Sequence, residues 1–227
     1  MASSTYKESF LSLCHQHQIL KFGTFTVKSG RISPYFFNAG SFSNASLLSS
    51  LAIAYAQAIA SSKVEFDVIF GPAYKGIPLC AIAAIKLAEL DPAKYGPVGC
   101  CFNRKEAKDH GEGGSLVGAS IKDKRVLIID DVITAGTAKR EAVEIIKANG
   151  GSLAGIVVAL DRQERAGDGG PDDQGLSAIG VLKKEYDVPM ITIITFADII
   201  RFSKDRLTTS EINAMEKYRD QYGSVDI

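Results

Sequence analysis

Short apolar segments alternate with segments of helical periodicity along most of this 227-residue chain. The expected strands are 66–70, 98–102, 125–129, 153–160 and 190–194. The expected helices before or between them are 45–61, 77–90 and 137–148. Strands that are apolar along their whole length and alternate with helices indicate a parallel sheet that is buried on both faces. We therefore expect an α/β fold with a central parallel sheet flanked by helices.

The two ends of the chain follow other patterns, although the length suits one sizeable domain. We expect residues 1–43 to form a small layer, the hood, beside an α/β core at 44–205, with a C-terminal helix within 206–227. The expected elements of the two ends are a helix at 6–20, strands at 22–27 and 35–38 around a turn at 30–34, and a helix near 207–222. Asn44 is expected to cap the first helix of the core.

Charge and composition argue against several classes of function. The 26 basic residues balance 26 acidic ones, so the surplus of positive charge that sequence-independent nucleic-acid binding needs is missing. The most apolar stretches, 51–60 and 76–87, fall short of the ~20 residues of a membrane-spanning helix. The first residues lack the pattern of a signal peptide, and the four cysteines and three histidines lack the spacing of a zinc site. We therefore expect a cytoplasmic protein whose metal, if any, is a hard cation.

The most specific segment, 126–138, is an apolar strand that runs into two acids and then into a turn of small residues that opens a helix. Ligands of such a sheet bind beyond the carboxyl ends of its strands, where this turn lies. Backbone N–H groups and the hydroxyls of Thr134 and Thr137 suit a phosphate monoester at the positive end of the helix dipole. Asp130 and Asp131 suit vicinal ribose hydroxyls as acceptors. Taken alone, Asp131 could be a turn residue and Thr137 an ordinary N-cap.

Two further segments carry positive charge beside glycines. Segment 71–78 lies between a strand and a helix, so Lys75 and the backbone N–H groups there suit a pyrophosphate, although a plain turn with a solvated lysine also explains it. Segment 103–114 has no apolar periodicity but several basic side chains and three glycines. It is either a solvated surface loop or a lid that neutralises a leaving group and excludes water.

These segments resemble the type I phosphoribosyltransferases, which use phosphoribosyl pyrophosphate (PRPP), and in particular the orotate members of that family. Besides the three segments above, the matching motifs are Lys-Ser-Gly-Arg at 28–31, Ser-Pro-Tyr-Phe-Phe at 33–37 and Asp-Arg-Gln-Glu at 161–164. The resemblance runs from about 22 to 195. It implies the type I fold with a parallel five-stranded sheet and an N-terminal hood. It also implies a homodimer in which a flexible loop at 103–115 contributes to the neighbouring active site.

The resemblance carries over a set of site residues, which we state as expectations. The implied PRPP site consists of Ala73, Tyr74, Lys75, Asp130, Asp131, Val132, Ile133, Thr134, Ala135, Gly136, Thr137 and Ala138. The implied orotate site consists of Lys28, Phe36, Phe37, Thr134 and Arg162, which offer cations for a carboxylate and an apolar wall for a flat ring. The implied catalytic cations of the loop are Arg104, Lys105, Lys108 and His110.

The implied reaction is displacement of pyrophosphate from C1 of the ribose by a ring nitrogen of orotate. Mg²⁺ is the implied cofactor, bound through PRPP and water without a direct protein ligand. Two other functions remain open on the residues alone. A PRPP-sensing regulatory module would bind nucleic acid without catalysis, which the zero net charge disfavours. A purine or uracil phosphoribosyltransferase would share the PRPP site and differ at the base.

Overall fold

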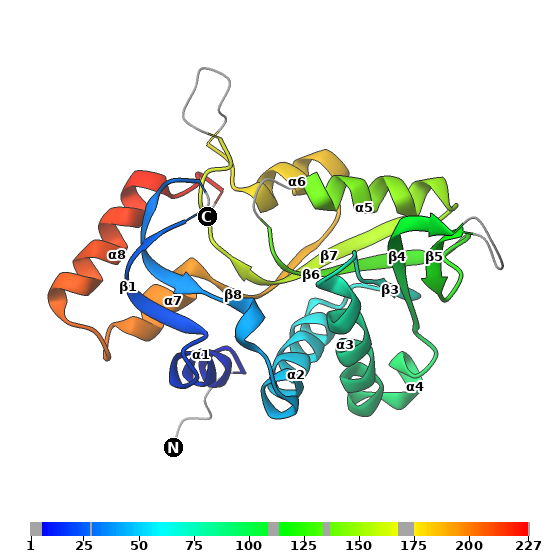
Figure 1. Cartoon of the computed structure of the whole chain (residues 1–227), viewed down its shortest axis with the longest axis horizontal. Helices are drawn as coiled ribbons and strands as arrows, with labels where there is room; N and C mark the ends of the chain where they lie inside the picture. Colours follow the sequence, from blue (N-terminus) through cyan, green and yellow to red (C-terminus); the bar gives the residue numbers. More distant parts are fainter. Residues whose placement is uncertain (1–5, 28, 109–113, 134–136, 168–174, 227) are drawn as a thin grey trace.

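The computed structural model describes residues 6–27, 29–108, 114–133, 137–167 and 175–226. Within these ranges, one six-stranded sheet carries helices on both faces, and a separate two-stranded sheet lies at one end of the molecule (Figure 1). The α/β class with a mostly parallel central sheet, expected from the alternation of strands and helices, is confirmed.

The central sheet contains all five expected parallel strands. Its spatial order is β5-β4-β3-β6-β7-β8. Its strands are β3 (Val68–Phe70), β4 (Gly99–Lys108), β5 (Gly114–Gly118), β6 (Arg125–Val132), β7 (Ser152–Asp161) and β8 (Met190–Thr195). β3 and β6 are neighbours in space but not in sequence, so the chain changes direction across the sheet between them. Ligands of open α/β sheets bind at such a switch point, beyond the carboxyl ends of the strands.

The expectation of a polar loop from residue 103 onward was wrong in part. β4 continues through Lys108, and β5 pairs with it antiparallel as a sixth strand, from Cys101↔Gly118 to Lys108↔Gly114. This hairpin extends the edge of the sheet, where strands need no apolar side chains on both faces. Backbone hydrogen bonds pair β5 with the outer part of β4, and this pairing requires no particular side chains. The sequence of the hairpin therefore lacks the apolar pattern by which buried strands can be predicted.

Alternate residues of β6 face the two helical layers. Leu127 and Ile129 pack in the core that includes α2 and α3, whereas Val126 and Ile128 pack in the core that includes α5 and α6. Figure 1 shows α2 and α3 on one side of the sheet and α5 and α6 on the other. The helices of the core are α2 (Ala45–Ser62), α3 (Gly76–Leu90), the short α4 (Pro92–Tyr95), α5 (Thr137–Ala148) and α6 (Ala178–Tyr186). Asn44 caps α2 as expected, accepting a hydrogen bond from the Leu47 N–H at 3.0 Å.

The hood consists of α1 (Tyr6–Gln16), β1 (Leu20–Thr26), β2 (Ile32–Phe37) and the 3₁₀ turn η1 (Ala39–Ser41). Two helices from the other end of the chain, α7 (Phe196–Ser203) and α8 (Thr209–Tyr222), contact it, α7 at α1 and α8 at β2. The expected turn at 30–34 is shorter than predicted, since β2 already begins at Ile32. α7 was not predicted, although Thr195 and Asp198 form a capping box at its start. The helix expected near 207–222 corresponds to α8, and α7 is an additional helix before it.

One helix of the described chain, α2, is long and apolar enough to cross a membrane by length and composition. This differs from the expectation that the apolar stretch there is too short. Its large side chains Leu51, Tyr55 and Ile59 are buried in the core of the fold, between the sheet and α3. A core helix with such a packing face satisfies the same length and composition criteria.

Candidate active site

Asp130 and Asp131 end the buried strand β6 at the switch point. The Oδ1 atom of each accepts a hydrogen bond from the next backbone N–H, at 2.9 Å from Asp131 and at 2.8 Å from Val132. The Oδ2 atom of each accepts a hydrogen bond from a lysine ammonium of another element. Each carboxylate is thus held in place by two donors of its own, a backbone N–H and a lysine ammonium.

The partner of Asp131 is Lys75, which follows the neighbouring strand β3. The Lys75 Nζ lies 2.7 Å from the Asp131 Oδ2, and the lysine side chain is 70% exposed. Its hydrogen bond to Asp131 raises the pKa of Lys75, so the ammonium stays charged. The structure therefore brings together two predicted site residues that lie 56 positions apart in sequence.

The partner of Asp130 is Lys139 of α5, which Sequence analysis did not predict. The two form a close ion pair, and Lys139 is only 4% exposed. Burial raises the pKa of Asp130, and the nearby Lys139 ammonium opposes that rise. The Tyr55 hydroxyl of α2 donates a hydrogen bond of 2.7 Å to the Asp130 carbonyl. Asp130 is therefore fixed from both layers of helices.

The segment after β3 turns tightly into α3. A Cβ on Gly71 would lie 2.1 Å from the carbonyl oxygen of Gly76, so a side chain at Gly71 would force these backbones apart. The segment also contains a cis peptide bond between Ala73 and Tyr74. The Ala73 N–H donates a hydrogen bond of 2.9 Å to the Asn103 side chain of β4. The predicted pyrophosphate segment is thus tied to the start of the β4–β5 hairpin.

The hairpin brings a second cation to the same place. The Lys105 ammonium lies 5.5 Å from the centroid of the Tyr74 ring, whose residue is 70% exposed. Arg104 is partly exposed on the same strand. Lys75 and Lys105 therefore place two basic side chains beside the segment that follows β3, while Arg104, as the neighbour of Lys105 in a strand, points to the other face of β4.

Several predicted site residues lie outside the described residues. They are Lys28, His110, Thr134, Ala135 and Gly136. Three others are described only as parts of their elements, since Lys108 ends β4 while Thr137 and Ala138 open α5. Of the remaining members of the run, Val132 is half-buried and Ile133 is buried. The start of α5 beyond β6 agrees with the expected strand, turn and helix.

The two predicted phenylalanines lie on opposite faces of the hood sheet, as neighbours in a strand do. Phe37 is 8% exposed and packs against Phe42 in the core. Phe36 is 36% exposed and stacks on Phe25, with ring centroids 5.6 Å apart. Phe36 is therefore the ring of this pair that is open to a ligand.

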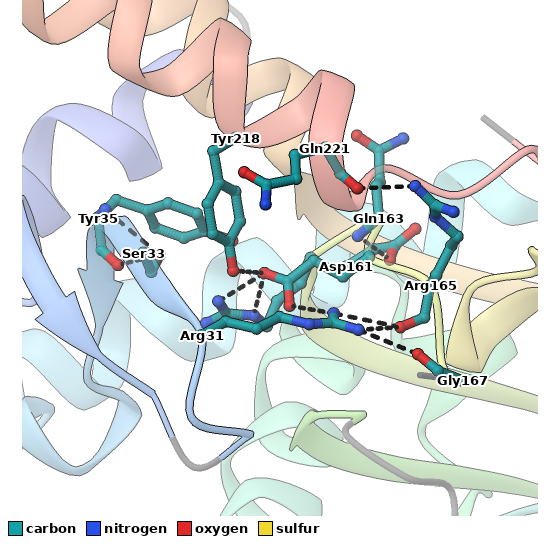
Figure 2. Close-up of polar contacts among 11 residues, drawn as sticks. Arg31, Ser33, Tyr35, Asp161, Gln163, Arg165, Gly167, Tyr218 and Gln221 are labelled. Carbon is teal, nitrogen blue, oxygen red and sulfur yellow. Dashed lines mark hydrogen bonds and ion pairs between the residues drawn. The ribbon is translucent and has the colours of Figure 1, made fainter. Parts of the chain in front are cut away.

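Arg162 follows β7 and is engaged on two sides. Its Nε and Nη2 donate hydrogen bonds of 2.9 and 2.6 Å to the Glu164 Oε1. Its guanidinium also lies 5.1 Å from the centroid of the Tyr35 ring in β2. Since β7 is the parallel neighbour of β6, Arg162 lies at the same edge of the sheet as Asp131. Figure 2 shows the surrounding network, in which residues of the hood, of the segment after β7 and of α8 meet.

Comparison with known proteins identifies the family. Residues 43–180 match the model of the phosphoribosyl transferase domain. An orotate phosphoribosyltransferase of Yarrowia lipolytica is 54% identical over 217 residues, covering 96% of this chain and 97% of that protein. One of Neurospora crassa is 52% identical over 231 residues, covering 99% of both. The chain belongs to the orotate phosphoribosyltransferase family.

Solved structures agree with this membership. The crystal structure of an orotate phosphoribosyltransferase of Francisella tularensis matches with a TM-score of 0.84 and 42% identity, covering 95% of this chain and all of that one. An adenine phosphoribosyltransferase of Leishmania donovani matches with a TM-score of 0.51 and 15% identity, which shows a shared fold only. The expected family and type I fold are confirmed, and the choice of base depends on side chains rather than on the fold.

Lys139, Glu164 and Tyr218 were not among the predicted site residues, although Glu164 stands in the Asp-Arg-Gln-Glu motif at 161–164. Lys139 had a local signal, because it precedes the buried Ala142, Val143 and Ile146 by three, four and seven positions and so lies on the buried face of α5. Glu164 and Tyr218 had none that links them, since 54 positions separate the two.

Proposed function

We propose that this chain transfers ribose 5-phosphate from PRPP to orotate, which gives orotidine 5′-monophosphate and pyrophosphate for pyrimidine synthesis. The observation that carries the proposal is the Lys75–Asp131 pair at the switch point of a chain in the orotate phosphoribosyltransferase family. The pair places a cation for pyrophosphate beside an acceptor for ribose hydroxyls. Both halves of PRPP can therefore bind at one edge of the sheet.

The proposed mechanism depends on positioning and on charge. The turn at 134–137 holds the 5-phosphate at the start of α5, and the carboxylate of Asp131 accepts hydrogen bonds from the ribose. As the bond from C1 to pyrophosphate breaks, negative charge grows on the leaving group, and Lys75 and Lys105 stabilise it. Orotate enters with its carboxylate ionised, and its ring nitrogen attacks C1 as the bond to pyrophosphate breaks. The proton of that nitrogen passes to the departing pyrophosphate, whose growing negative charge makes it a base, so little base catalysis by the protein is required. Phe36 and Arg162 orient the ring and its carboxylate.

Mg²⁺ is proposed to arrive with PRPP. Among the described residues, no group of three or more histidine, cysteine, aspartate or glutamate side chains is placed to hold a metal. A hard cation that keeps its waters and binds phosphate oxygens needs no such cage. When bound, it supplies positive charge against the leaving pyrophosphate.

A homodimer is proposed, in which the part of the hairpin beyond Lys105 contributes to the neighbouring site while Lys105 stays beside Tyr74 of its own chain. The adjacent helices α2 and α3 leave Ile53, Ile85 and Leu90 44%, 57% and 53% exposed, as an apolar interface would require. Figure 1 places the hood and the β4–β5 hairpin at opposite ends of the long axis of the chain. A hairpin that closes over a base near the hood is therefore better supplied by a second copy.

A cytoplasmic location is proposed as well. The structure describes all four cysteines, and each is a free thiol. Free thiols persist in reducing compartments, whereas secreted proteins of this size commonly pair theirs.

The test of the function is pyrophosphate release from PRPP and Mg²⁺ with orotate, compared with uracil, hypoxanthine and adenine under the same conditions. Of the four bases, we expect only orotate to cause release of pyrophosphate. If pyrophosphate were released only with a purine or with uracil, that base rather than orotate would be the substrate. No release with any base, together with a salt-dependent shift of RNA or DNA, would support the regulatory module instead.

The catalytic role of the hairpin is tested by Lys108→Ala. A cation that acts mainly on the leaving group in the transition state predicts that kcat falls about a hundredfold while the affinity for PRPP changes little. Lys122→Ala, which removes another exposed lysine, serves as the control. Equal losses of kcat and of PRPP affinity would contradict a role confined to the transition state.

A further inference from the structure

The C-terminal helix α8 and the residues after it contact the segment that follows β7. The Tyr218 hydroxyl donates a hydrogen bond of 3.0 Å to the Glu164 Oε1. The Arg165 N–H donates one of 2.9 Å to the Tyr222 carbonyl, and the Arg165 Nη2 donates one of 2.7 Å to the Gln221 carbonyl. The end of α8 therefore binds both Glu164 and Arg165, and Figure 2 shows Tyr218 and Gln221 beside Arg165.

Glu164 is the common acceptor of this network. Its Oε1 receives hydrogen bonds from Arg162 and from Tyr218, and its Oε2 lies 3.4 Å from the Arg31 Nη1. The side chains of Glu164 and Arg162 are only 12% and 18% exposed. A carboxylate that is shared by two guanidinium groups and largely withdrawn from water holds both in a defined geometry.

The two arginines differ in how their terminal nitrogens are used, since both Nη atoms of Arg31 donate to the protein whereas only one of Arg162 does. The Arg31 Nη2 is used by the carbonyls of Arg165 and Gly167, at 3.2 and 3.0 Å, and its guanidinium lies 4.9 Å from the centroid of the Tyr222 ring. The Arg162 Nη1 has no hydrogen-bond acceptor among the described residues, while the Tyr35 ring supports the guanidinium plane. Arg31 is thus a structural tie, and Arg162 can still donate to an anion.

We propose that Glu164 and Tyr218 are positioning residues for base recognition, which hold the Arg162 guanidinium on the Tyr35 ring so that its free edge meets the carboxylate of an anionic pyrimidine. This inference rests on the proposed function and adds the C-terminal helix to the site. Burial raises the pKa of Tyr218 to about 12, so its hydroxyl remains a donor to Glu164 over the physiological range.

Two variants test the network, one at its shared acceptor and one at a single donor. Glu164→Gln keeps the shape and replaces the charge, so Arg162 loses its charged acceptor and we expect the KM for orotate to rise about ten- to hundredfold. Tyr218→Phe keeps the ring that packs edge-on against Phe196 and removes only the hydroxyl, with an expected rise of about three- to tenfold. The KM for PRPP should stay within about twofold in both, since the hydrogen bonds and ring contacts of the two side chains, within the described chain, are with Arg31, Arg162, Phe196 and Tyr222 and with each other.

The measurement is initial-rate kinetics with each substrate varied, at fixed Mg²⁺, for the full chain and its variants. Tyr95→Phe is the matched control, because it removes the hydroxyl of another buried tyrosine whose ring stacks on Phe66. If Glu164→Gln does not fold, Tyr218→Phe carries the test. A KM for orotate within twofold of the unaltered protein, or equal rises in the KM for both substrates, would overturn the inference alone. An unaltered chain that releases no pyrophosphate with orotate would overturn the proposed function together with it.

Discussion

Asp130 and Asp131 are neighbours with the same kinds of partner, and they differ in the lysine that each binds. Both use Oδ1 to accept a backbone N–H and Oδ2 to accept a lysine ammonium. The Lys139 side chain on Asp130 is 5% exposed, whereas the Lys75 side chain on Asp131 is 70% exposed. Two ion pairs of the same composition thus stand in different surroundings, one inside the fold and one facing solvent.

The difference indicates which pair a ligand can rearrange. An exposed ammonium regains water when it leaves its carboxylate, so Lys75 can be transferred to pyrophosphate at little cost while Asp131 turns to the ribose. A buried ammonium has no such replacement, and Lys139 must stay where it is. We infer that Asp130 holds the end of β6 in place and that Asp131 responds to the substrate.

The largest expected effect is the loss of stability in Lys139→Met. The substitution keeps the volume and leaves Asp130 buried without its cation, which should lower the free energy of unfolding by about 3–5 kcal/mol. Urea unfolding at one fixed protein concentration measures the change. The double variant Asp130→Asn/Lys139→Met, which removes both charges, should recover part of it. A double variant that is no more stable than Lys139→Met would show that the unpaired carboxylate is not the cause.

The fold could be predicted from the sequence where burial leaves a pattern. The parallel strands were found because their residues are apolar on both faces, as in β6 between Val126 and Ile129. The β4–β5 hairpin was missed because backbone pairing, rather than apolar side chains, holds Asn103 to Lys108 in a strand. In the same way α7 was missed although its capping box could be read from Thr195 and Asp198, since its eight residues are short for a periodic signal.

Candidate site residues could be predicted where they lie at the carboxyl end of a strand. Asp130 and Asp131 were predicted because they are the first polar residues near the carboxyl end of the apolar strand β6, and Lys75 because it lies between β3 and α3. The pairing of Lys75 with Asp131 and the contact of Glu164 with Tyr218 join residues 56 and 54 positions apart, so no local pattern contains them. They are set by the order of strands and by the docking of α8, which only the folded chain reveals.

A smaller effect on folding, with a clear effect on the reaction, is expected for Lys75→Met. Because its ion pair is exposed, the free energy of unfolding should change by less than about 1 kcal/mol. The kcat/KM for PRPP should fall about a hundredfold, since the cation proposed to stabilise the leaving pyrophosphate is lost. Lys86→Met is the matched control, because Lys86 forms an exposed ion pair of 2.7 Å with Glu89 farther along α3. A stability loss as large as that of Lys139→Met would remove the distinction between the two pairs.

The smallest effect on stability is expected for an exposed ion pair, Asp67–Arg125, at the amino ends of β3 and β6. Asp67, just before β3, accepts hydrogen bonds from the Arg125 Nε and Nη2 at 3.2 and 2.9 Å, and these bonds lower the pKa of Asp67 from 3.8 to about 2. Because the pKa of Asp67 is lower in the folded chain than in the unfolded chain, its carboxylate adds stability at every pH above the unfolded pKa of 3.8. This contribution is lost as the pH falls from about 4 towards 2.

Asp67→Asn should therefore change the folding equilibrium constant at pH 7 by no more than about fivefold, because solvent screens the pair. The difference from the unaltered protein should shrink as the pH falls through the range from about 4 to 2. Urea unfolding at pH 7, 4 and 3 measures both. This pair has two hydrogen bonds between its side chains, whereas Asp130–Lys139 has one. If Asp67→Asn destabilised the chain as much as Lys139→Met does, hydrogen-bond geometry rather than burial would explain the difference between the two aspartates of β6.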